Sequence, residues 1–124
     1  MTQEEFDNFL KDMGGLKSCY RTDSVIDSVH FFHIGPGWLQ LVKELIEDLI
    51  ELGWDKQVAQ VKEKFGGLRF YIGSGTDEIW KRITKAENES FKICEETGEL
   101  GELRTKGGWM RTLCDECYEK WLNE

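Results

Sequence analysis

Residues 61–72 read VKEKFGGLRFYI, and the arrangement of the chain follows from this stretch. Alternate positions 61, 63 and 65 precede the Gly66-Gly67 pair, and apolar residues alternate again over 68–72. A period of two is typical of a strand, and a glycine pair between two such runs is typical of a tight turn. The stretch therefore predicts an antiparallel hairpin.

Two amphipathic helices are predicted to flank this hairpin. The first spans residues 38–52 before Gly53, and the second spans about 77–97, between a capping Thr76 and Gly98. Both carry apolar residues at helical spacing, which predicts that these faces are buried against the sheet. The apolar positions are Trp38, Leu41, Val42, Leu45, Leu49 and Leu52 in the first helix and Ile79, Ile83, Ala86 and Phe91 in the second.

The two ends of the chain show weaker patterns. Residues 2–13 begin with a capping box and predict a short helix. Residues 16–36 predict a loop that contains a short strand near 28–33. At the other end the pattern predicts a second small hairpin from residues 100–104 and 109–113, followed by a short terminal helix.

Length and composition fit one folded domain. The chain has 124 residues, of which 40% are hydrophobic, with five Trp and seven Phe, so it can bury a core of its own. The predicted fold class is α+β, a small antiparallel sheet of hairpins packed by two main helices, with a degenerate zinc-ribbon-like C-terminal end. We expect three parts: a variable N-terminal segment (1–36), a helix-hairpin-helix core (37–98) and the zinc-ribbon-like end (99–124).

We expect no targeting signal in the chain. Met1 is followed by Thr-Gln-Glu-Glu, and no stretch is apolar enough to span a membrane. We therefore expect a cytoplasmic location, where cysteines are kept as thiols. The formal net charge is −8 and no basic block is present, which argues against non-specific nucleic-acid binding.

The cysteine spacing near the C-terminus predicts a metal site. Cys114 and Cys117 form a C-x-x-C pair, and twenty residues upstream Cys94 begins a C-x-x-T-G stretch with Thr97 in the place of a second cysteine. Two C-x-x-C pairs at such a separation are typical of structural zinc, which takes four ligands. Three of the four are therefore present. The candidates for the fourth ligand are Cys19, His30 and His33.

Other interpretations of these cysteines stay open at this point. The thiols of a former zinc site can pack as small apolar groups, and a disulfide from Cys94 to Cys114 or Cys117 is less favoured in a reducing compartment. A redox C-x-x-C pair opens a helix beside a βαβ unit, and no such unit is predicted here. Because no other catalytic pattern is present, we expect a protein that is not an enzyme.

The outer face of the first hairpin is predicted to be basic. It would carry Lys62, Lys64, Arg69 and Tyr71. Such a face can bind single-stranded nucleic acid through base stacking and phosphate contacts. A sheet face that is simply solvated and decorated with charge is the more ordinary outcome.

Several motifs in this order resemble a family of small uncharacterised proteins from bacteriophages and bacterial genomes. They are Gly37-Trp38 before a helix, residues 61–71, Ala86-Glu87 with Ser90, Cys94-x-x-x-Gly98, and residues 108–117, GWMRTLCDEC. Members of the family carry a QVKEKFG-LRFY strand pair and an end of the form C-x-x-C-G…GGW-RTLC-x-x-C. The resemblance covers roughly residues 35–118. It implies a metal knuckle at Cys94, Cys114 and Cys117, and Thr97 departs from its pattern at the fourth ligand.

From this resemblance and the acidic charge we expect a small accessory protein of a phage or mobile element that binds a protein of its bacterial host. An inhibitor of a host defence nuclease, of the anti-CRISPR type, is one such function, since the basic channels of nucleases attract acidic competitors. The candidate partner-binding residues lie on the acidic face of the helix over 38–52, namely Glu44, Glu47, Asp48 and Glu51. The alternatives are a zinc-ribbon module for nucleic-acid binding or transcription and a small enzyme that uses cysteine chemistry.

Overall fold

The computed structural model describes residues 1–21 and 23–124, and its fold is α+β, as predicted. The helical elements are α1 (Gln3–Asp12), η1 (Val29–Phe31), η2 (Pro36–Trp38), α2 (Leu39–Glu51), α3 (Asp77–Ser90) and α4 (Asp115–Leu122). The strands are β1 (Leu16–Ser18), β2 (Val25–Ile26), β3 (Phe32–His33), β4 (Gln57–Lys64), β5 (Gly67–Ile72), β6 (Glu102–Lys106) and β7 (Trp109–Leu113). No helix among the described residues is long and apolar enough to cross a membrane.

The predicted central hairpin is present as β4 and β5, with Val61 opposite Phe70. Its turn lies one residue earlier than predicted, because Phe65 and Gly66 are the two residues with left-handed backbone (φ 55° and 82°). Gly67 instead begins β5, where the ring of Phe91 lies so close that an added Cβ would come within 2.3 Å of it. A tertiary contact, not the turn itself, therefore requires the second glycine.

The main sheet is mixed, whereas only antiparallel hairpins were predicted. β1 and β3 pair in parallel with successive parts of β4, and β2 pairs antiparallel with β1. These strands have two or three residues each, so they cannot show a readable alternation, and residues 16–36 were predicted to be mostly loop. Of that region, the strand predicted near 28–33 is found as β3.

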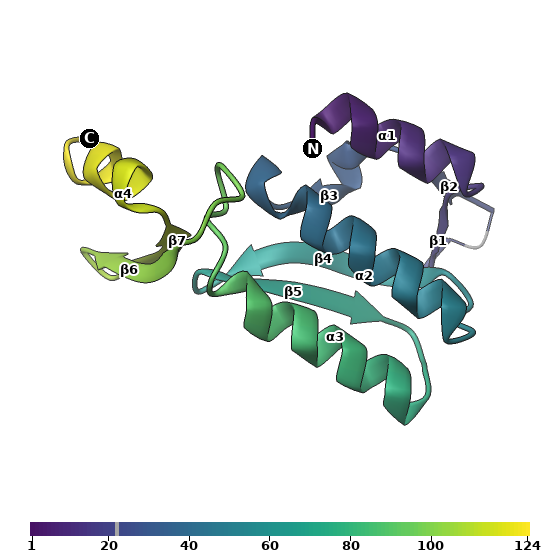
Figure 1. The fold of residues 1–124 in the computed structure, drawn as a ribbon. Coiled ribbons are helices and arrows are strands. Elements are labelled where there is room, and N and C mark those ends of the chain that lie inside the picture. Colours follow the sequence, from purple (N-terminus) through teal and green to yellow (C-terminus); the bar gives the residue numbers. More distant parts are fainter. Residues whose placement is uncertain (22) are drawn as a thin grey trace.

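The helices α2 and α3 lie on one face of the β4–β5 hairpin, and α1 packs beside α2 (Figure 1). The predicted stripe of α2 is buried as far as Leu49, whereas Leu52 lies beyond the helix and is 38% exposed. The helix predicted to reach residue 97 ends at Ser90. Residues 91–101 turn away from it and form the segment that carries Cys94.

The predicted second hairpin is formed by β6 and β7 and is followed by α4. These elements form a C-terminal unit at one end of the main sheet, beyond the 91–101 segment (Figure 1). The unit has a separate, small core, made of Cys94, Leu113, Cys114 and Trp121. Two of these four residues are cysteines, so two of the three metal-ligand candidates also belong to the core of this unit.

Candidate metal centre and the adjoining pocket

Cys94 is positioned by a tight turn over residues 94–98. The backbone N–H of Gly98 donates to the carbonyl of Cys94 (2.9 Å), and the N–H of Cys94 donates to the carbonyl of Glu99 (2.7 Å). Gly98 adopts φ +81°, a conformation that favours glycine. The C-x-x-T-G stretch therefore folds as a knuckle even though its second cysteine is missing.

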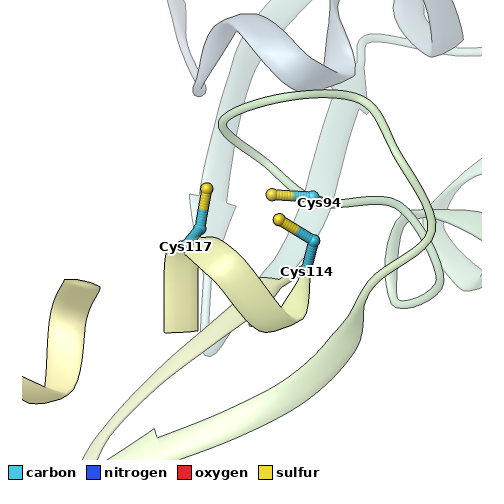
Figure 2. Close-up of side chains that lie close together, drawn as sticks. All are labelled: Cys94, Cys114 and Cys117. Carbon is cyan, nitrogen blue, oxygen red and sulfur yellow. The ribbon is translucent and has the colours of Figure 1, made fainter. Parts of the chain in front are cut away.

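Cys114 and Cys117 are positioned by the start of α4. Cys114 is the N-cap residue of this helix, and the N–H of Tyr118 donates to its carbonyl (2.9 Å). Cys117 lies in the first turn, three residues later, so both side chains are on the same side of the helix start. Figure 2 shows their sulfurs on the side of the helix where Cys94 lies.

The three predicted metal ligands form one cluster. Their sulfur atoms all lie within 4.8 Å of one another, and Cys94 and Cys114 are buried while Cys117 is half-buried. A tetrahedral zinc site with Zn–S bonds of about 2.3 Å needs sulfurs roughly 3.8 Å apart, which this cluster meets with small adjustments. The cluster can bind a metal ion. All four cysteines are free thiols in the described structure, so the disulfide alternative is not found.

The candidates for a fourth ligand do not join this cluster within the described residues. Cys19 follows β1 and lies against Gly73, at the end of β5. His30 and His33 line a separate surface hollow with Tyr20. Instead Thr97 is the neighbour of the sulfurs, with its Oγ1 3.9 Å from the Cys114 sulfur, and a neutral hydroxyl is a poor zinc ligand.

The knuckle turn favours a thiolate at Cys94. Burial raises the pKa of this thiol, but hydrogen bonds from the Thr97 hydroxyl and from nearby backbone N–H groups outweigh burial and lower the pKa to about 7. Burial, followed by hydrogen bonding with the other two cysteines, raises the pKa of Cys117 to about 12. Backbone N–H groups directed at a sulfur stabilise the thiolate form, which is the form that binds metal.

The knuckle is docked on the main core through the Gly35–Trp38 segment. The indole N–H of Trp38 donates to the carbonyl of Ile93, and the N–H of Gly37 donates to the carbonyl of Glu95, both at 2.8 Å. A Cβ on Gly37 would lie 2.1 Å from the carbonyl oxygen of Cys94. The Gly37-Trp38 motif of the sequence therefore forms the contact between the knuckle and the main core.

The C-terminal hairpin is joined to the knuckle by Arg111. Its Nε donates to Oε1 of Glu95 (2.6 Å), and a terminal nitrogen donates to Oε1 of Glu96 (2.7 Å). The next residue, Thr112, accepts a backbone hydrogen bond from Glu95 and donates its hydroxyl to the carbonyl of Gly66 (2.6 Å). The knuckle, the β4–β5 turn and β7 therefore meet at one junction.

A pocket of about 640 Å³ lies at this junction. Three aromatic and three charged side chains contribute to its lining, namely Phe65, Trp109, Trp121, Glu63, Glu95 and Arg111. Because these residues come from four separate segments, no local sequence pattern predicted the pocket. The only sequence signal was the aromatic residues themselves, of which Phe65 and Trp109 are 63% and 77% exposed.

The acidic face of α2 is partly neutralised by the chain itself. Glu47 pairs with Lys43 (3.0 Å), and Asp48 pairs with Arg82 of α3 (2.7 Å). Glu44 accepts a hydrogen bond from Gln40, and Glu51 is exposed at the helix end. Of the four candidate partner-binding residues, two are therefore engaged in ion pairs within the protein.

The basic face predicted for the central hairpin is present. Lys62 and Arg69 are directly opposite each other in the register of β4 and β5, and His33 of β3 is opposite Lys62 on its other side. The helices α2 and α3 cover the other face of this hairpin (Figure 1).

No family model, curated protein or solved structure matches this chain, so its function is inferred from the thiol cluster and the pocket themselves.

Proposed function

We propose that this protein is a non-enzymatic protein-binding module whose C-terminal unit is held in place by a structural zinc ion at Cys94, Cys114 and Cys117. The convergence of these three thiols, from two segments of the chain, is the observation that supports it. Zinc bound there would cross-link the knuckle to the start of α4. Thr97 stands at the place of the second knuckle cysteine and offers only a neutral hydroxyl. No cysteine therefore supplies the fourth zinc ligand there.

A structural role suits the position of the cluster. Two of the three thiols are buried, and they pack with Leu113 and Trp121 in the small C-terminal core. A unit with so few buried apolar residues gains little stability from packing alone, and metal binding is a common substitute in such units. The site therefore stabilises the surface that the unit presents.

Zinc content and thermal unfolding test this role. We expect one zinc per chain by elemental analysis after purification with zinc, and a lower melting temperature after chelation. The Cys114→Ser variant should lose the zinc, whereas Cys19→Ser should keep it because Cys19 lies outside the cluster. A wild-type protein that takes up no zinc under these conditions would contradict the proposed site.

The partner is proposed to be a host protein with a basic surface, met in the cytoplasm of a bacterial host. The net charge of −8, the exposed aromatic residues at the junction and the resemblance to phage proteins support this. A defence nuclease of the CRISPR type fits the description. Pull-down from host lysate and a plasmid-protection assay test the proposal, and two negative results would rule it out.

A second candidate function is single-stranded nucleic-acid binding, favoured by the basic face of β4 and β5. Neither Lys62 nor Arg69 forms an ion pair within the described residues, and Tyr71 lies on the same face. A mobility-shift assay at low salt separates the two functions. Steep salt dependence that is lost in Lys62→Glu but kept in the control Lys81→Glu would favour this candidate over protein binding.

A further inference from the structure

We propose that the pocket between the β4–β5 turn and the C-terminal hairpin binds a positively charged side chain, a lysine or arginine, of the protein partner. This inference rests on the protein-binding function proposed above and specifies the site and the group it recognises. It is supported by three features of the pocket: its aromatic walls, an unpartnered carboxylate oxygen, and its balance of charge.

The walls of the pocket include three aromatic side chains, of which two are exposed. Phe65 lies at the hairpin turn in a left-handed backbone conformation (φ 55°), which is uncommon for a bulky residue and places its ring at the tip of the hairpin. Trp109 is 77% exposed beside the Gly107-Gly108 turn, and Trp121, 8% exposed, lines the same pocket. Aromatic rings that converge on one space attract cations through their electron-rich faces.

One acidic residue of the lining, Glu95, has a buried carboxylate oxygen that lacks a donor in the described structure. Glu95 is 7% exposed, and its Oε1 receives the hydrogen bond from Arg111, but its Oε2 is buried without a partner in the described structure. Burying a carboxylate oxygen without a hydrogen bond is costly, so this atom indicates a missing donor. An ammonium or guanidinium group supplies such a donor.

The charges in the lining favour a cation. Glu63 and Glu95 contribute two carboxylates, and one oxygen of Glu63 accepts the N–H of Gly66 (2.6 Å). The one cation of the lining, Arg111, is paired with both Glu95 and Glu96. The lining itself thus carries one more carboxylate than cation, and an anionic ligand would meet two carboxylates.

The protein already places cations over two of these rings. The ammonium of Lys64 lies 5.5 Å from the ring centre of Phe65, and that of Lys106 lies 5.7 Å from the ring of Trp121. Neither lysine contributes to the lining of the pocket. The volume of about 640 Å³ exceeds that of one basic side chain, so the pocket can also take the apolar stem and part of a neighbouring residue.

Isothermal titration calorimetry with synthetic peptides tests the proposal on the full-length protein purified with zinc. Three peptides share one sequence and differ at the central residue, which is arginine, lysine or citrulline, the neutral analogue of arginine. We expect the arginine or the lysine peptide to bind at least about tenfold more tightly than the citrulline peptide. The comparison of the first two identifies the preferred cation. Equal binding of all three, or no binding of any, would overturn the proposal.

Variants of the pocket supply the controls. Trp109→Ala and Glu63→Gln should each weaken binding of the charged peptide, whereas Trp80→Ala, an exposed tryptophan on α3, should not. Thermal unfolding confirms that each variant is folded. If wild type and Trp109→Ala capture the same host protein equally well, the proposed role of the pocket is overturned, whereas the proposed protein-binding function remains. If the charged peptides bind more tightly than the neutral peptide but no host protein is captured, the result would support cation binding by the pocket. The same result would count against the proposed binding of a host protein.

Discussion

At the scale of single residues, Thr97 is the position at which the candidate metal centre departs from four cysteine ligands. The knuckle around it keeps the backbone hydrogen bonds and the glycine of a C-x-x-C-G turn, and its hydroxyl lies 3.9 Å from the Cys114 sulfur. The Thr97 side chain therefore lies beside a sulfur of the cluster, but its neutral hydroxyl is a poor zinc ligand. The difference from a C-x-x-C-G turn thus concerns one side chain, and the backbone of the turn is present.

We expect Thr97→Cys to raise the zinc affinity by at least about tenfold, because a fourth thiolate would replace a weak neutral oxygen ligand. Competition with a chromophoric chelator measures the affinity. The control is Thr105→Cys, which adds a cysteine at an exposed position of β6 and should leave the affinity unchanged. Equal affinities for wild type and Thr97→Cys would show that Thr97 does not face the bound ion.

At the scale of elements, the Gly35–Trp38 segment connects the main core to the knuckle. It contributes two hydrogen bonds and a close backbone approach, in which Gly37 lies against the carbonyl of Cys94. The segment precedes α2, whose buried stripe anchors it in the core. The position of Cys94 is thus fixed by a segment that contacts it from more than fifty residues earlier in the chain.

Substitution of Gly37 by alanine should lower the free energy of unfolding by about 2–3 kcal/mol, because the added Cβ would overlap backbone atoms that cannot move independently. Denaturant unfolding measures the loss. Gly107→Ala is the matched control, because nothing lies within 4 Å of its added Cβ and only its left-handed backbone (φ 54°) is disfavoured, at a cost of about 1 kcal/mol. Equal losses in the two variants would mean that the close approach at Gly37 is not rigid.

At the scale of the whole molecule, two cores of unequal size are joined at one junction. Among the described residues, the main core buries twenty-two, whereas the C-terminal core buries four. The junction consists of the knuckle, Arg111 and the contact between Thr112 and Gly66. Because stability is not uniform across such a structure, the smaller unit should open more readily than the larger one.

Chelation of zinc should therefore accelerate amide hydrogen exchange in β6, β7 and α4 while β4 and β5 remain protected. The metal would link only the knuckle and α4, so its removal acts first on the unit that depends on it. Hydrogen-exchange mass spectrometry, with and without a chelator, resolves these segments. Simultaneous loss of protection in both units would show that the protein unfolds as a single cooperative body.

Prediction from the sequence succeeded where local patterns are long. Alternation around Val61 and Phe70 and the apolar stripe of α2 predicted the hairpin and its helical cover, and the C-x-x-C spacing predicted the three clustered thiols. It was wrong for the end of α3, which stops at Ser90. The residues after Ser90 are held instead by contacts with distant elements, such as the hydrogen bond from Trp38 to Ile93.

The sequence by itself determined the longer elements and the identity of the three clustered cysteines, because these depend on periodicity and on spacing within short segments. Only the tertiary structure decided that Cys19, His30 and His33 stay outside the cluster, that Phe65 adopts the turn conformation, and that an aromatic pocket forms beside the knuckle. The physical reason is that close packing between distant segments, as at Gly67 against Phe91, selects one arrangement among several that local preferences allow.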